Sequence, residues 1–187
     1  MTQTPTEIEI AEATTGDIDG ILDLQARNQP DQGGTLSHSF SRHDMATMIA
    51  AMPVIVARRA GRVIGYLMSS LLTANSDVAI LRAMLAVYPG APDAYVYGPI
   101  CVDADERGQG LPRTMFAALR KRLPGREGIL FIRQDNAASL KAHANLGMQT
   151  VAASRIRVSP TTCCPTPDRI PRIVSLHGTF VNALDRH

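Results

Sequence analysis

The sequence has few of the residues from which disulfide-rich, metal-binding, membrane-spanning or nucleic-acid-binding proteins are built. Its 187 residues include three cysteines, no tryptophan and 4% aromatic residues. The cysteine count is odd, and Cys163 and Cys164 are neighbours, so neither a disulfide framework nor a metal site is indicated. No apolar run is long enough to cross a bilayer, and a formal charge of +2 is small for a protein that binds a phosphate backbone. We therefore expect no metal, no membrane and no nucleic-acid partner.

Size and composition predict one ordinary globular domain. A hydrophobic fraction of 45% over 187 residues supplies one core and little for a second. We expect a single domain over 1–187, with a short flexible N-terminus at 1–6 and a C-terminal tail after about residue 180. The start of the chain has no basic stretch followed by an apolar run, so we expect no signal peptide and a cytoplasmic protein.

The hydrophobic periodicity predicts alternating strands and helices. Period-two or continuous apolar runs indicate strands at 7–13, 54–59, 63–72, 94–102, 128–133, 148–158 and 172–177. Helical spacing indicates helices at 18–25, 42–52, 76–88, 112–123 and 137–146. The segment 159–171 is rich in Pro and Thr and is predicted to be a loop. This order is typical of an α+β protein whose sheet is covered by helices on both faces.

A glycine-containing loop follows the predicted strand 94–102. Arg107, Gly108, Gln109 and Gly110 come just before the predicted helix 112–123. A helix N-terminus presents unpaired N–H groups and the positive end of the helix dipole. Glycines let a phosphate approach that backbone, and Arg107 and Arg113 could add charge-assisted hydrogen bonds. Glycines before a helix also often only make a turn, and the loop matches neither a Walker loop nor a dinucleotide fingerprint.

The loop resembles the acetyl-coenzyme A signature of the GNAT superfamily of N-acetyltransferases, R/Q-x-x-G-x-G/A. The resemblance implies the acyl-CoA N-acyltransferase fold, with a mixed, mostly antiparallel sheet of about six to seven strands. It also implies that the strand backbone pairs with the pantetheine arm and that the loop amides face the pyrophosphate. The cofactor-binding residues predicted from this part of the chain are Ile100, Cys101, Val102, Arg107, Gly108, Gln109, Gly110, Leu111, Pro112 and Arg113. Pro112 departs from the family pattern, because proline has no N–H to offer.

A second segment begins at Asn136, with His143 two helical turns later and Gly147 at the end. Asn136 is explained as an N-cap and Gly147 as a helix stop. The segment is also similar to the family's N-x-x-A/S-x-x-x-Y-x-x-x-G-F pattern, which implies that Asn136 and Ser139 lie at the cofactor. His143 takes the position of the tyrosine that protonates the departing thiolate. Two alternatives stay open for His143, the catalytic acid or a contact to the thioester arm only.

The resemblance implies direct transfer of an acetyl group from acetyl-coenzyme A (acetyl-CoA) to a primary amine, without a metal. We expect a small-molecule amine as acceptor, with a protein N-terminus or lysine as the alternative. A non-catalytic acetyl-CoA sensor and an interaction module are further alternatives. The acceptor is expected near 29–41 with His38, the insertion 76–92 and the loop with Cys163 and Cys164. The insertion could equally form a homodimer contact through its apolar side.

The general base is not identified by the sequence. Tyr95 and Tyr97 lie on the strand that leads to the cofactor and Asp93 lies before it, but packing or a surface position is the commoner role of each. Cys101 within a strand is expected to be a small buried residue and not an acyl carrier.

Overall fold

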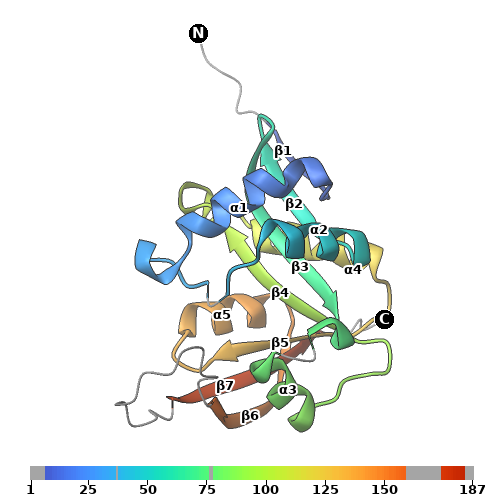
Figure 1. Ribbon diagram of the computed structural model, residues 1–187, viewed down its shortest axis with the longest axis vertical. Helices are drawn as coiled ribbons and strands as arrows, with labels where there is room; N and C mark the ends of the chain where they lie inside the picture. Colours follow the sequence, from blue (N-terminus) through green and yellow to red (C-terminus); the bar gives the residue numbers. More distant parts are fainter. Residues whose placement is uncertain (1–6, 37, 76–77, 159–173, 184–187) are drawn as a thin grey trace. The chain divides into compact units, whose positions relative to one another are not determined.

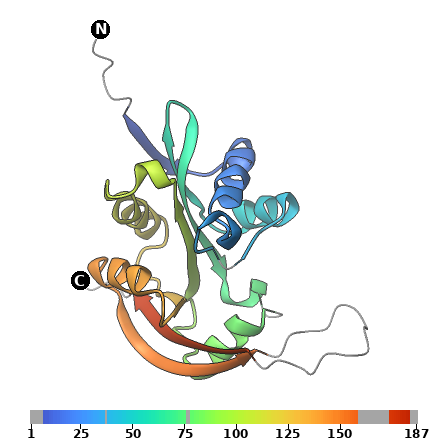
Figure 2. The ribbon, with the colours of Figure 1, turned by 90° about the vertical axis from the view of Figure 1, so that its left-hand side faces the viewer.

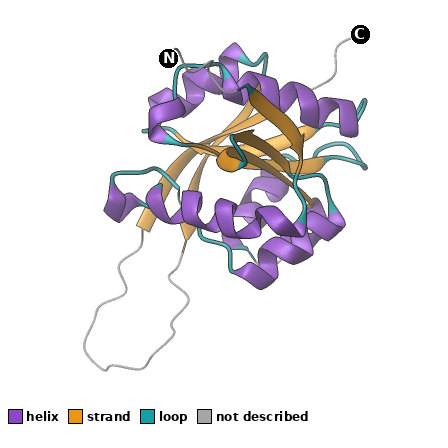
Figure 3. Ribbon diagram, turned by 90° about the horizontal axis from the view of Figure 1, so that it is seen from above, coloured by secondary structure: helices purple, strands orange, loops and turns teal. Residues whose placement is uncertain are grey.

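The structure is a computed structural model, which describes residues 7–36, 38–75, 78–158 and 174–183. The chain forms two compact units. The first unit consists of residues up to Leu71 together with Tyr95–Arg126, and the second consists of Leu72–Ala94 together with residues from Glu127 onward. Both units combine helices with strands, as Figure 3 shows by colour.

The first unit contains four antiparallel strands in the order β1 (Ile8–Glu12), β2 (Ile55–Arg59), β3 (Arg62–Leu71) and β4 (Tyr95–Val102) (Figure 1). Strands β2 and β3 form the predicted hairpin. Its turn residues, Ala60 and Gly61, have φ angles of 50° and 76°. Such left-handed conformations suit a tight hairpin turn, and they are costly for most residues other than glycine.

Helices cover both faces of this four-stranded sheet. The short turn η1 (Thr15–Asp17) leads into α1 (Ile18–Arg27), and η2 (Pro30–Gln32) lies between α1 and α2 (Arg42–Ala51). Figure 2 shows α1 and α2 on one face of the sheet and α4 (Leu111–Arg122) on the other. The buried residues Ile18, Ile21 and Leu24 of α1 recur at the spacing of one helix face.

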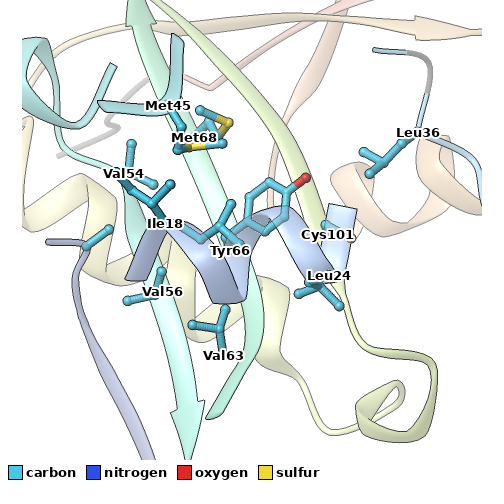
Figure 4. Packing of buried hydrophobic residues seen from close by; sticks show 12 residues of the cluster. Ile18, Leu24, Leu36, Met45, Val54, Val56, Val63, Tyr66, Met68 and Cys101 are labelled. Carbon is cyan, nitrogen blue, oxygen red and sulfur yellow. The ribbon is translucent and has the colours of Figure 1, made fainter. Parts of the chain in front are cut away.

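The core between α1, α2 and the sheet surrounds the fully buried side chain of Tyr66 (Figure 4). Met45 of α2 and Met68 of β3 are fully buried in the same cluster. Leu36, which follows η2, and Cys101 of β4 belong to this cluster too. The segment between α1 and α2 is therefore anchored beside the C-terminal half of β4.

A β-bulge interrupts the pairing of β3 with β4. Leu67 pairs with Ile100 and Ser69 pairs with Tyr97, so Met68 alone stands opposite Gly98 and Pro99. The extra residue turns Tyr97 and Ile100 toward the same face of the sheet, which simple alternation would not do. The ring of Tyr97 meets that of Phe116 of α4 edge to face, with 5.4 Å between centroids.

The second unit contains the antiparallel strands β5 (Gly128–Arg133), β7 (Val174–Ala183) and β6 (Gln149–Val158), with β7 paired to both others. After η3 (Leu72–Asn75), helix α3 (Ala79–Val87) packs Met84 and Ile80 in a cluster with Ile129, Phe131 and Val151. Part of the apolar side of the insertion is thus covered within the chain, whereas Val87 is exposed. The homodimer contact stays a prediction.

Strand β7 corrects one prediction about the end of the chain. The strand was expected at 172–177 and a tail after about residue 180, but β7 runs to Ala183. Gly178 lies within β7 and pairs with Arg133 of β5 and Ser154 of β6, because a central strand with two partners overrides the weak preference of one glycine. The predictions for 1–6 and 159–171, including Cys163 and Cys164, lie outside the described residues.

Over the described part of the chain, no helix has the length and apolar character needed to cross a membrane. The described residues likewise contain no cluster of three or more His, Cys, Asp or Glu side chains suited to a metal ion.

Candidate functional site

The loop between β4 and α4 carries the first group of predicted site residues. Asp103 caps a short turn, η4 (Ala104–Glu106), by accepting a hydrogen bond from the Asp105 N–H at 3.2 Å. Gly108 and Gly110 follow with φ angles of 81° and 76°. A Cβ built on either glycine would meet nothing within 4 Å, so the need for glycine comes from the backbone conformation and not from crowding.

Consecutive backbone N–H groups of this loop point away from protein acceptors. Among the described residues, the N–H groups of Gly108, Gln109, Gly110 and Leu111 have no recorded backbone or side-chain acceptor. They lie at the N-terminus of α4, where Gly110 is the N-cap residue and has no side chain with which to cap. A row of unpaired N–H groups at a helix N-terminus is a binding site for an anion such as phosphate.

Pro112 is the second residue of α4, since the helix begins at Leu111. The sequence predicts a helix from residue 112, one residue after the observed start. The N–H groups of Arg113 and Thr114 both donate to the Gly110 carbonyl, at 3.0 and 3.2 Å. Because those two are used within the helix and proline has none, the row of available N–H groups ends at Leu111.

Polar side chains hold the loop against the hairpin. Arg59 donates from Nε and Nη2 to the two carboxylate oxygens of Glu106, at 3.0 and 2.9 Å. Gln109 donates to Glu106 at 2.8 Å and accepts from Arg59 at 3.0 Å. The hydrogen bond from Arg59 is the main reason that the pKa of Glu106 lies below its ordinary 4.5. The side chain of Gln109 is turned toward the protein, so its backbone is the part presented to a ligand.

A second set of contacts joins the loop to the C-terminal turn of α1. The buried Asp103 carboxylate accepts from Arg27 at 2.8 Å and from Arg62 at 3.0 Å. Burial alone would raise the pKa of Asp103, but the hydrogen bonds from Asp105 and Arg27 and the nearby charges lower it below 3.8. Arg107 donates from Nη2 to the Asn28 Oδ1 at 3.0 Å.

The end of β4 presents Ile100 and Val102 half-buried, whereas Cys101 is buried opposite Tyr66. Burial raises the pKa of the Cys101 thiol to about 12, so Cys101 stays protonated at neutral pH and is unsuited to act as an acyl carrier. Burial also raises the pKa of Tyr95 to about 12 and that of Tyr97 further. These tyrosines therefore serve packing better than proton abstraction.

The second unit carries the other group of predicted site residues on helix α5 (Ala137–Asn145). Asn136 caps the helix, since its Oδ1 accepts from the Ser139 N–H at 3.0 Å. Gly147 follows the helix with a φ angle of 85°. Both helix-end predictions are confirmed.

His143 is buried, with 5% of its surface exposed. Its Nδ1 lies 2.7 Å from the Ser139 carbonyl oxygen and 3.3 Å from the Ser139 Oγ. A carbonyl oxygen can only accept, so Nδ1 carries the proton and Nε2 is an acceptor in the neutral ring. Burial lowers the pKa of His143 below 6.5, against the opposing effect of the Ser139 hydrogen bond, so the neutral ring dominates at pH 7.

The structure brings the predicted residues together in two groups. The first unit holds those from Ile100 to Arg113, and the second holds Asn136, Ser139 and His143. Sequence reasoning missed the side chains that support the loop, namely Asn28, Arg59, Asp103 and Glu106. Asn28 and Arg107 are 79 residues apart, and no local spacing signals such a contact.

A glycine loop at a helix start, with N–H groups that have no acceptor among the described residues, is an arrangement suited to phosphate-containing ligands. A family model described as the acetyltransferase (GNAT) family matches residues 19–148, a range that includes both the loop and α5. The chain therefore belongs to the GNAT family of acetyltransferases, which confirms the resemblance seen in the sequence.

Solved structures of several proteins share the fold of this chain. The yncA protein of Salmonella typhimurium, determined with its cofactor acetyl-CoA, has a TM-score of 0.66 and 18% identity, over 97% of this chain and 96% of that one. The ribosomal-protein-S18-alanine N-acetyltransferase of Escherichia coli has a TM-score of 0.64 and 16% identity, over 95% and 94%.

A phosphinothricin acetyltransferase of Sinorhizobium meliloti, in complex with acetyl-CoA, has a TM-score of 0.64 and 18% identity, over 95% of this chain and 88% of that one. No curated protein matches the chain in sequence. At these identities the neighbours establish the fold, and the predicted fold class is confirmed.

Proposed function

We propose that this protein is an N-acetyltransferase that uses acetyl-CoA to acetylate a primary amine, most simply that of a small molecule. The observation that carries the proposal is the row of N–H groups from Gly108 to Leu111 at the start of α4, for which the described residues supply no acceptor. Family membership supplies the reaction class, and two neighbours of the same fold were determined with acetyl-CoA.

The residues of the loop fit the pyrophosphate of this cosubstrate. The N–H groups of Gly108, Gln109, Gly110 and Leu111 would donate to its oxygens, with the dipole of α4 and the exposed Arg113 adding positive potential. The backbone of Ile100, Cys101 and Val102 would hold the pantetheine arm. Asn136 and Ser139 are the proposed contacts on α5.

When bound, acetyl-CoA supplies a thioester whose carbonyl carbon accepts an amine. The loop N–H groups hold the charged end of that molecule, so their contribution is to binding and orientation. Cys101 is buried and its raised pKa makes it unsuited to form a covalent acetyl-enzyme, which favours direct transfer. The amine must be neutral to attack, which requires loss of its proton before transfer.

For His143 we propose the second of the two alternatives, a neutral contact in place of a proton donor. An acid at this position would need a proton on Nε2 in addition to the one on Nδ1. Burial opposes that charged form. In the neutral form that the Ser139 carbonyl selects, Nε2 accepts hydrogen bonds, so His143 orients a donor of the cofactor and the departing sulfur obtains its proton elsewhere.

The proposed acceptor site includes the segment 29–41, because Leu36 of that segment packs in one cluster with Cys101 of β4. The charged side chains nearest the loop include Arg27, Arg59 and Arg62, which already neutralise Asp103 and Glu106. Because these carboxylates are neutralised, they leave no excess negative charge to attract the several positive charges of a polyamine. It favours an acceptor with a single amine, and a protein N-terminus or lysine is the competing class.

A second candidate function is a sensor that binds acetyl-CoA without turnover. It is favoured by the neutral His143 and by Pro112, which shortens the row of loop N–H groups. The enzyme and the sensor share the cofactor site and differ only in chemistry. They are therefore separable by experiment.

Release of free thiol from acetyl-CoA, measured over a broad panel of amines and peptides, tests the proposal. Calorimetric titration with acetyl-CoA accompanies it. Binding with thiol release for a subset of small amines supports the proposed enzyme, whereas release with peptides only would identify a protein acetyltransferase. Binding without any release would identify a sensor, and the absence of binding would contradict both functions.

A further inference from the structure

The side chain of Arg107 is used inside the protein as well as at the edge of the cofactor loop. It is exposed, and its Nη2 donates to the Oδ1 of the buried Asn28 at 3.0 Å. A guanidinium group has five donors, so this bond leaves others for a ligand. Any ligand that orders Arg107 therefore also acts on Asn28.

Asn28 connects α1 to the segment that follows. It is the C-cap residue of α1, and its Nδ2 donates to the Leu24 carbonyl at 2.9 Å. Its own carbonyl accepts from the Leu36 N–H at 3.2 Å. Gly34 lies so close that a Cβ there would be 1.9 Å from the Asn28 oxygen. The path of residues 34–36 thus depends on the position of Asn28.

Phe40, near the end of the segment 29–41, is also bound to the C-terminal turn of α1. Gln25 donates from Nε2 to the Phe40 carbonyl at 3.0 Å, and its Oε1 accepts from the Phe40 N–H at 2.9 Å. Between these ties, Leu36 is buried in the cluster with Tyr66 and Cys101. Leu36 and Phe40 are therefore held by two residues one helical turn apart, Asn28 through its backbone carbonyl and Gln25 through its side chain.

A second contact joins the C-terminal turn of α1 to the residues before the glycine loop. Arg27, the neighbour of Asn28, donates to Asp103 at 2.8 Å. Asp103 and Arg107 flank the two ends of η4. Arg27, the last residue of α1, and its C-cap residue Asn28 thus contact the two residues that flank η4, the turn that leads into Gly108.

We propose that Asn28 is a positioning residue, through which binding of acetyl-CoA at the loop orders the segment 29–41 that would meet the acceptor. This inference rests on the proposed function, because it takes acetyl-CoA as the ligand of the loop. Ordering of Arg107 by the ligand is transmitted to Leu36 through the hydrogen bonds that both residues make with Asn28. Couplings of this kind typically change an affinity by at least about fivefold.

Hydrogen exchange of the Leu36 amide, followed by NMR with and without saturating acetyl-CoA, tests the coupling. In the wild-type chain acetyl-CoA is expected to slow this exchange about fivefold or more. In Asn28→Ala the slowing is expected to be lost although acetyl-CoA still binds. Asp23→Ala, an exposed change on α1, is the matched control and is expected to keep the full effect.

Variants of Arg107, the hydrogen-bond partner of Asn28, keep the test valid if Asn28→Ala does not fold. Arg107→Met removes the donor without changing α1 and is expected to abolish the slowing at saturation. Arg107→Lys retains a donor and is expected to restore part of it, which a merely structural role for Arg107 would not explain. Equal slowing in the wild type and in Arg107→Met would overturn the coupling.

The same spectra separate the two proposals. Shifts of the Gly108–Leu111 amides on adding acetyl-CoA, without any slowing at Leu36, would overturn the coupling and leave the proposed function standing. Unchanged Gly108–Leu111 amides would overturn the proposed function, and the coupling with it.

Discussion

Arg59 and Glu106 form a two-point ion pair that fixes the loop between β4 and α4 to the β2–β3 hairpin. The guanidinium donates from Nε and Nη2 to both carboxylate oxygens, at 3.0 and 2.9 Å, and the Glu106 side chain is 9% exposed. Gln109 adds a hydrogen bond to each partner. The N–H groups of the loop are thus held in place before a ligand arrives, which lowers the cost of ordering them on binding.

Glu106→Ala is expected to weaken acetyl-CoA binding about fivefold, because it releases Arg59 and Gln109 together. Calorimetric titration measures the change. Glu9→Ala is the matched control, since Glu9 pairs with Arg58 at 2.9 Å in the same unit and touches no loop residue by any recorded contact. Equal losses in both variants would argue against a specific role for the Arg59–Glu106 pair.

Gly110→Ala is expected to lower both stability and acetyl-CoA affinity. At a φ of 76° an alanine costs roughly 1–2 kcal/mol of unfolding free energy, and its methyl group enters the open space beside the N–H groups. Gly125→Ala, at a φ of 71°, imposes similar strain beyond the other end of α4. Thermal unfolding should show a loss in both variants, and calorimetry should show a loss of affinity, about tenfold, in Gly110→Ala alone. A similar affinity loss in Gly125→Ala would contradict the assignment of the site.

Pro112→Ala adds one N–H group to the row that ends at Leu111. A hydrogen bond to a charged group contributes about 1.5 kcal/mol or more, so acetyl-CoA is expected to bind at least about tenfold more tightly, or unchanged if the new N–H does not reach the pyrophosphate. Pro124→Ala, in the exposed turn after α4, controls for the loss of proline rigidity. A large decrease in affinity for Pro112→Ala would mean that the loop contacts are wrongly assigned.

His143→Phe distinguishes the two roles of His143, a neutral hydrogen-bond acceptor for the cofactor or the catalytic acid. Since burial lowers the pKa of His143 below 6.5, an acid role would make kcat decline as the pH rises above that pKa. The proposed neutral role predicts no such decline in the wild type between about pH 6 and 8, and a profile of the same shape in the variant. Steady-state kinetics across this range decides between the two. A wild-type decline that disappears in the variant would restore His143 as the acid.

Much of the fold could be predicted from the sequence because the signals were local. The apolar runs of β2 and β3 and the helical spacing in α1 and α4 are set by residues a few positions apart. The insertion shows the limit of such reasoning. Its apolar side was visible in the sequence, but Ile129 and Val151, which cover it in the structure, come from strands distant along the chain.

Some features of the candidate site could also be predicted from local sequence, whereas others depend on long-range packing. The glycines, the Asn136 cap and the position of Pro112 near the helix start follow from short-range backbone rules. The contact of Arg107 with Asn28 and that of Arg59 with Glu106 span 79 and 47 residues. They depend on how β2, α1 and the loop pack, which a single sequence does not encode in any spacing. The neutral form of His143 likewise required knowledge of its burial.

The central claim is that the N–H groups from Gly108 to Leu111 bind the pyrophosphate of acetyl-CoA. Titration of the ¹⁵N-labelled protein with acetyl-CoA, followed by NMR of the backbone amides, tests it most directly. These amides are expected to undergo the largest downfield shifts in the spectrum, because their N–H groups gain charged acceptors. Saturable binding that leaves the amides of Gly108, Gly110 and Leu111 unshifted would contradict it.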